Sequence, residues 1–91
     1  MATVTECLTA ATDSVTVITD INTRGAASSH ASGCANQTAI NTRVQANVDH
    51  LVTILAYDGT EGDQPDIAGS SEDKSSYTGA ITTGNAYIAA N

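Results

Sequence analysis

Four residues of this chain have side chains that commonly bind metal ions or act as nucleophiles: Cys7, His30, Cys34 and His50. Structural zinc sites bring such residues in tight pairs, with two cysteines or two histidines only a few positions apart. The two cysteines here are 27 positions apart, and the two histidines are 20 positions apart. This spacing predicts no zinc site. We interpret the cysteines as free thiols and the histidines as surface or interface residues.

His30 and Cys34 are four positions apart and would face the same way on a helix, where a histidine could activate a thiolate. No acid that would orient the histidine and no oxyanion donor is evident nearby. The chain also lacks the serine-hydrolase nucleophile motif and the phosphate-binding loop motif. We therefore predict no catalytic residue, no cofactor and no enzymatic activity.

Acidic residues gather in one part of the sequence, between Asp58 and Asp73. Calcium-binding loops place several oxygen ligands at fixed offsets. The carboxylates of Asp58, Glu61, Asp63 and Asp66 do not match that register. A solvated acidic loop is the favoured interpretation, and a weak, irregular calcium site is the alternative.

The formal net charge is −7, with Arg24, Arg43 and Lys74 as the only basic residues besides histidine. Three cations cannot form the basic patch by which proteins bind nucleic acids, nor can they hold an anionic membrane surface. The first 15 residues lack the basic start and apolar run of a signal peptide, and no apolar stretch is long enough to span a membrane. We expect a protein that is made and kept in a cytoplasm, with no direct nucleic-acid or membrane partner.

Apolar residues recur at alternating intervals of four and three, which is the heptad-like pattern of packed helices. The first such stripe predicts a helix over residues 2–23 and consists of Val4, Leu8, Ala11, Val15 and Ile18. A strand through residues 14–19 is the alternative, because β-branched residues dominate there. The sequence leaves the choice between helix and strand open for Val15–Ile21.

A second stripe predicts a helix over residues 37–57 and consists of Ile40, Val44, Asn47, Leu51 and Ile54. Asn47 is either a buried polar residue that fixes the register or an edge residue, with Val48 taking its place in the core. A third stripe predicts a helix over residues 71–90, with Ser70 or Ser71 as its N-cap. It consists of Tyr77, Ile81, Gly84 and Ile88. Gly79 and Gly84 weaken this helix, so it needs packing partners.

Two segments rich in small residues connect these helices. Residues 25–36 form either a loop or a thin continuation of the first helix, and residues 58–70 contain three glycines and Pro65. The six residues 19–24 recur almost unchanged at 38–43. This echo is either chance or a duplicated contact, in which each copy's arginine would pair with the acidic loop of a neighbouring molecule.

The core of this 91-residue chain is poor in large side chains, because it has no Trp, no Phe and only three Tyr. Small chains that bury little apolar surface are commonly stabilised by oligomerisation. We expect a single all-α domain over residues 1–91, a helical hairpin plus a C-terminal helix, whose stripes are completed by oligomerisation or docking. The predicted interface residues are Val4, Leu8, Val15, Ile18, Ile40, Val44, Leu51, Ile54, Tyr77, Ile81 and Ile88.

The chain is rich in Ala, Thr, Ser and Asn and poor in Lys. This composition is clearest in the stretches AINTRVQANVDHLVTIL (39–55) and GAITTGNAYIAA (79–90). In this respect the chain resembles small structural proteins from the virions of tailed bacteriophages. The resemblance implies a decoration, cement, neck or fibre protein, made in the host cytoplasm and located in the virion. Its partners would be copies of itself or other virion proteins, which makes it a homo-oligomer or scaffold-bound.

The acidic charge also supports a second hypothesis. A small acidic regulatory protein, such as an inhibitor or an antitoxin-like partner, would be steered electrostatically to a basic surface and mask it.

Overall fold

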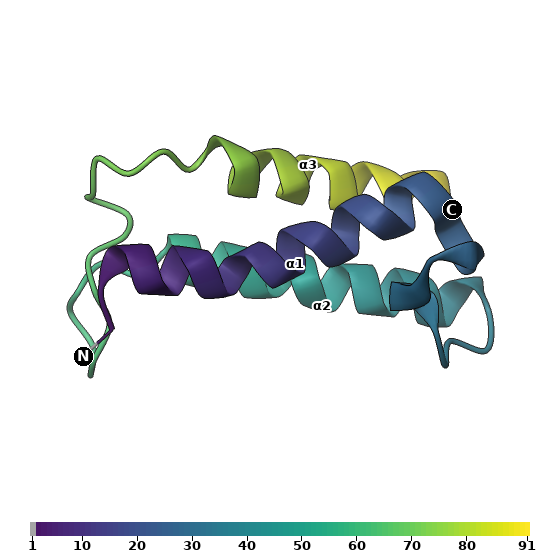
Figure 1. Cartoon of the computed structure of the whole chain (residues 1–91), viewed down its shortest axis with the longest axis horizontal. Helices are drawn as coiled ribbons and strands as arrows, with labels where there is room; N and C mark the ends of the chain where they lie inside the picture. The colour runs from purple at the N-terminus through teal and green to yellow at the C-terminus, as the bar shows by residue number, and fades with distance from the viewer. Residues whose placement is uncertain (1) are drawn as a thin grey trace.

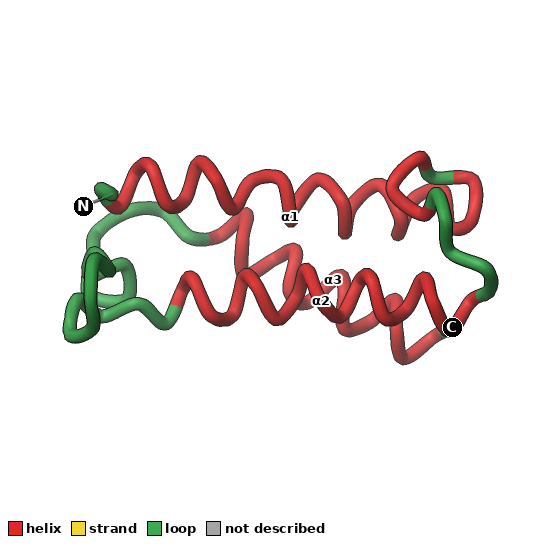
Figure 2. The backbone as a smooth tube through the Cα atoms, turned by 90° about the horizontal axis from the view of Figure 1, so that it is seen from below, coloured by secondary structure: helices red, strands yellow, loops and turns green. Residues whose placement is uncertain are grey.

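The computed structural model describes residues 2–91, which form a bundle of three α-helices: α1 (Val4–Arg24), α2 (Gln37–Leu55) and α3 (Ser75–Ala90). The helices run up, down and up beside one another, so the two termini lie at opposite ends of the bundle (Figure 1). The connections between helices gather at those two ends (Figure 2). This confirms the predicted all-α hairpin plus C-terminal helix. None of the described helices combines the length and apolarity needed to cross a membrane.

α1 begins at a capping box. The Thr3 hydroxyl accepts a hydrogen bond from the Glu6 backbone N–H at 3.1 Å, and the Glu6 carboxylate accepts one from the Thr3 N–H at 3.0 Å. The helix is continuous through Val15–Ile21, so the strand alternative is wrong. Its β-branched threonines are accommodated because their hydroxyls donate to backbone carbonyls one turn earlier, as in Thr19 to Val15 at 2.8 Å.

α2 begins at Asn36, whose side chain accepts a hydrogen bond from the Ala39 N–H. It ends at Leu55, two residues before the predicted boundary. The chain leaves the helix there because the Tyr57 carbonyl accepts hydrogen bonds from the backbone N–H groups of residues 67 and 68, at 2.9 and 2.8 Å.

The position of Asn47 decides between the two interpretations of the α2 stripe. Its side-chain amide donates to the Arg43 carbonyl at 2.8 Å and is only partly buried. Val48 is buried instead. The edge interpretation of Asn47 is therefore confirmed.

α3 begins at Ser75, so the predicted start at residue 71 and the predicted Ser70 or Ser71 cap are wrong. The Asp73 carboxylate accepts the hydrogen bond of the Ser75 N–H at 2.9 Å and serves the first turn. Lys74 Nζ donates to the carbonyls of Ser70 and Glu72, at 2.8 and 3.3 Å. These bonds hold residues 70–74 in a non-helical path.

The connections are more ordered than a pair of flexible loops. Residues 25–36 contain two 3₁₀ turns, η1 (Gly25–Ala27) and η2 (Ser29–Ala31), and do not continue α1. The long connection between α2 and α3 is anchored by Ile67, whose side chain is 0% exposed. The predicted acidic loop therefore also closes one end of the core.

The core consists of side chains from all three helices and both connections: Leu8, Ala11, Ile18, Ile21, Ala31, Ile40, Val44, Val48, Leu51, Ile54, Ile67, Ala80 and Tyr87. α3 contributes Ala80, Gly84 and Tyr87, whereas Ile81 and Ile88 are only partly buried. The core stripe of α3 is therefore displaced from the predicted one.

Gly84 marks the closest approach of α3 to the α1–α2 hairpin. A Cβ atom at this position would lie 2.5 Å from Val48 Cγ2 and 3.3 Å from both Ile18 Cγ2 and Val44 Cγ1. Two tyrosines tie down the rest of the helix. The Tyr77 hydroxyl donates to the Leu8 carbonyl at 2.9 Å, and the Tyr87 hydroxyl accepts a hydrogen bond from Gln37 Nε2 at 3.0 Å.

We predict opposite effects of alanine at the two glycines of α3. Gly84→Ala should lower the free energy of unfolding by about 1–3 kcal/mol, because overpacking against Val48 outweighs the gain in helix propensity. Gly79→Ala should raise it by up to about 1 kcal/mol, because no atom lies within 4 Å of the added methyl group. Urea unfolding followed by circular dichroism measures both. Two stabilised variants would contradict the close approach of α3.

Candidate functional site

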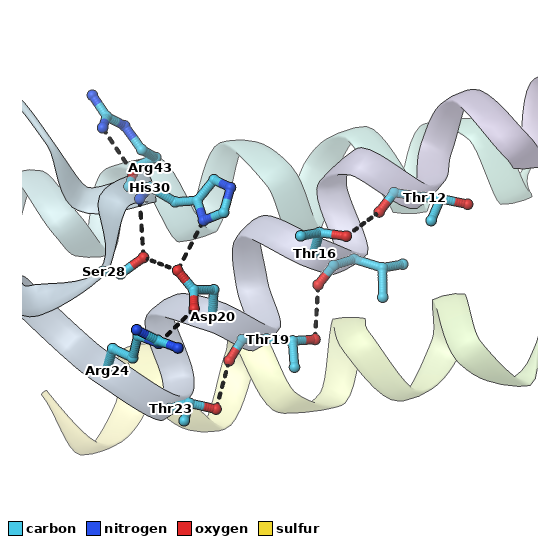
Figure 3. Close-up of polar contacts among 10 residues, drawn as sticks. Thr12, Thr16, Thr19, Asp20, Thr23, Arg24, Ser28, His30 and Arg43 are labelled. Carbon is cyan, nitrogen blue, oxygen red and sulfur yellow. Dashed lines mark hydrogen bonds and ion pairs between the residues drawn. The ribbon is translucent and has the colours of Figure 1, made fainter.

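A polar cluster lies where α1 ends and the two 3₁₀ turns begin (Figure 3). Asp20 Oδ2 accepts hydrogen bonds from the Ser28 hydroxyl, at 2.5 Å, and from the His30 ring at Nδ1, at 2.9 Å. Arg24 Nε lies 3.1 Å from the other carboxylate oxygen. The C-terminal end of α1 thus supplies the carboxylate and the guanidinium, and the α1–α2 connection supplies the hydroxyl of Ser28 and the imidazole of His30.

Serine, histidine and aspartate are the residue types of a hydrolytic triad, so their geometry needs to be tested. Catalysis requires the histidine ring to take the serine proton. Here the Ser28 hydroxyl donates to the aspartate and accepts a hydrogen bond from the His30 backbone N–H at 3.0 Å. Ser28 is also 4% exposed. This arrangement fastens the 3₁₀ turn to α1 and does not present a nucleophile.

Arg43 extends the cluster to α2. Its guanidinium donates to the carbonyls of His30 and Ser32, at 2.9 and 2.7 Å. The echoed segments 19–24 and 38–43 therefore end α1 and begin α2 respectively, and each arginine forms contacts within the chain around the same connection. No sequence pattern predicted this cluster. The only signal for it was that Asp20, Ser28 and His30 lie near one another along the chain.

The two cysteines are free thiols. Cys7 lies in the first turn of α1 and Cys34 in the α1–α2 connection, at opposite ends of the bundle (Figure 1). His50 is exposed on α2. Within residues 2–91 no group of three or more His, Cys, Asp or Glu side chains is placed to hold a metal ion.

Two carboxylates of the acidic loop accept hydrogen bonds from groups within the loop and stabilise its conformation. Asp58 Oδ1 accepts hydrogen bonds from the Thr60 hydroxyl and N–H, at 2.6 and 3.1 Å, and Asp66 Oδ1 accepts one from the Gly69 N–H at 2.8 Å. The Thr60 hydroxyl and N–H hold the pKa of Asp58 below its usual range. Within residues 2–91 these carboxylates do not form a group of three or more that is placed to hold a metal ion, so the alternative of an irregular calcium site gains no support.

An open hollow of about 470 Å³ lies between the last turn of α2 and the acidic loop. We call it the loop hollow. Its lining residues are Val52, Thr53, Ala56, Tyr57, Asp58, Thr60, Glu61 and Gln64. Val52 is 50% exposed and is the one large apolar side chain of the described residues that is exposed.

A second surface runs along α1 and α3, and we call it the uncharged face because the threonine row of α1 and the residues of α3 that form it carry no charge. Threonines recur on α1 at alternating intervals of four and three, and all six are exposed: Thr5, Thr9, Thr12, Thr16, Thr19 and Thr23. Four of these hydroxyls donate to carbonyls one turn earlier. Figure 3 shows those of Thr16, Thr19 and Thr23. The row borders α3, because the hydroxyls of Thr12 and Tyr77 lie 3.5 Å apart. α3 itself contains no charged residue.

The residues predicted to form an interface lie mainly inside the chain's own core. Six of them are buried there: Leu8, Ile18, Ile40, Val44, Leu51 and Ile54. The other five are partly buried against it: Val4, Val15, Tyr77, Ile81 and Ile88. All eleven therefore pack within one chain, and contact of the partly exposed five with a partner stays a prediction.

In comparisons with known proteins, the chain matches no protein-family model, no curated protein and no solved structure.

We predict that Asp20 makes stability depend on pH in the acid range. The Ser28 hydroxyl, and after it His30, hold the pKa of Asp20 below its usual value. A carboxyl group with a lowered native pKa stabilises the fold fully above its unfolded pKa of about 3.9, and this contribution is lost as the pH falls through the native value. The difference in unfolding free energy between the wild type and Asp20→Asn should therefore be present at pH 6 and shrink below about pH 4.

Urea unfolding between pH 2.5 and 7 measures this difference. Asp13→Asn, which removes an exposed carboxylate from the same helix, is the matched control and should give a small, flat difference. An Asp20→Asn difference that stays constant across the range would contradict the role of the cluster.

Proposed function

We propose that this protein is a non-enzymatic structural subunit of a larger assembly, which packs against copies of itself through the uncharged face. The observation that carries the proposal is the pairing of the threonine row on α1 with the wholly uncharged α3. The core stripe of α1 is already covered by α2 and α3. The threonine row is a second heptad-like stripe on the same helix, and within the described chain nothing covers it.

Charge favours this face for contact between copies. Each copy has a net charge of −7, and like charges brought within about 10 Å repel strongly at 0.1 M salt. Two copies that meet through the acidic loop would oppose their carboxylates. Two copies that meet through the uncharged face oppose fewer carboxylates, because the row is bordered by Asp20, which is paired with Arg24, and at Thr5 by Glu72. The side chains there are mostly Thr, Ala, Ser and Gly, which lose little conformational entropy when ordered.

Within this class, we propose a component of a phage virion, such as a decoration, cement, neck or fibre protein. The support for this narrower proposal is the resemblance in amino-acid composition described above. The other candidate is a small acidic regulatory protein that masks a basic partner. It is favoured by the fact that Arg24, Arg43 and Lys74 all bind groups of their own chain, so that most carboxylates face solvent without a cationic partner among residues 2–91.

We predict that the double variant Thr16→Glu/Thr82→Glu remains helical but loses self-association. Both positions are exposed, so the fold should tolerate glutamate, while like charges facing each other across an interface cost several kcal/mol. The association constant, measured by light scattering on a sizing column, should fall by at least about tenfold, which corresponds to about 1.4 kcal/mol.

Thr42→Glu is the matched control, because Thr42 is an exposed threonine on α2 with the same hydrogen bond to the carbonyl one turn earlier. It should leave the association constant almost unchanged. Equal losses in the double variant and the control would reject the uncharged face as the interface. A wild-type protein that stays monomeric and binds a basic protein would favour the regulatory hypothesis.

A further inference from the structure

We propose that the loop hollow binds a lysine or arginine side chain from a basic segment of a different protein. The proposal concerns a surface separate from the uncharged face and does not depend on self-association. It rests on three features of the hollow that suit the same occupant: an exposed apolar wall, unpaired carboxylates at the rim, and the negative end of a helix.

The wall of the hollow fits the apolar stem of a long basic side chain. Val52 exposes half of its surface there, although the described chain otherwise covers its large apolar residues. The partly buried ring of Tyr57 lines the same space. Lysine and arginine lay their methylene groups on apolar surface while the charged head stays near water, and their cations favour aromatic faces.

The rim of the hollow supplies the negative charge. Asp58 and Glu61 both line it, and neither forms an ion pair with a basic residue of the described chain. Both hydrogen bonds from Thr60 are to Asp58 Oδ1, so Oδ2 is left for an incoming donor. Asp58 is ionised at neutral pH, since its pKa is held low by those same bonds.

The end of α2 adds to this field. Val52 and Thr53 lie in its last turn, where the carbonyl dipoles make the helix end negative. No basic residue of α2 occupies that turn to offset the effect. A metal ion alone would use the carboxylates but gain nothing from Val52 and Tyr57, and nucleic acid would be repelled by the acidic rim. A basic protein segment satisfies all three features.

The experiment is a titration of the full chain with an acetylated, amidated Gly-Arg-Gly-Arg-Gly peptide, followed by backbone amide shifts in NMR at 150 mM salt. We expect saturable shifts at residues 52–64. The double variant Asp58→Asn/Glu61→Gln should weaken binding about tenfold, because this is the affinity that two exposed ion pairs together contribute. Val52→Thr, which keeps the side-chain shape, should also weaken it by a few-fold.

The matched control is Asp63→Asn/Glu72→Gln, which removes the same charge from the same α2–α3 connection but from residues that do not line the hollow. It should change the affinity less than about twofold. Equal losses in the two double variants would mean diffuse attraction to an acidic protein and would overturn the proposal, as would the absence of saturable shifts in the wild type. Circular dichroism of each variant establishes that the fold is retained.

Discussion

The close approach of α3 to the α1–α2 hairpin is the constraint on which the rest of the structure depends. A chain without Phe or Trp cannot fill a wide core, so the helices must lie close enough for Ile, Val and Leu to fill it. Gly84 permits this by placing backbone against Val48 and Ile18 where a methyl group would collide. Tyr77 and Tyr87 then fix α3 along its length, each through a hydrogen bond to the hairpin.

The lack of Phe and Trp also affects the surface of the protein. With few large apolar groups, the ends of the helices are held by polar contacts, and all three basic residues are used within the chain. Arg24 and Arg43 serve the cluster around Asp20, and Lys74 serves the turn before α3. The remaining carboxylates make the surface of the protein negative, and their density is highest in the acidic loop. The chain therefore has both a strongly acidic end and a face whose own residues, the threonine row and α3, carry no charge.

The three helices could be predicted because the apolar period is strong in each, whereas finer features depended on the tertiary structure. Ala80 and Tyr87 are buried in place of Ile81 and Ile88, which are only partly buried, because α3 turns the side that carries Gly84 toward the hairpin. Ile67 could not be recognised as buried within a Gly-rich acidic segment. The threonine row was visible as a period in the sequence, but its exposure is known only once the opposite face of α1 is seen to form the core. The site around Asp20 depends on how the connection folds back on α1, which no local pattern specifies.

We propose that each chain completes its own core and associates through a separate face. The most direct measurement is a dilution series of the wild-type protein with native mass by light scattering and helix content by circular dichroism on the same samples. We expect a defined oligomer at high concentration that dissociates into a helical monomer of 9.2 kDa with unchanged helix content. Loss of helix content in step with dissociation would contradict the self-contained core, and a monomer at every concentration would contradict the proposed self-association.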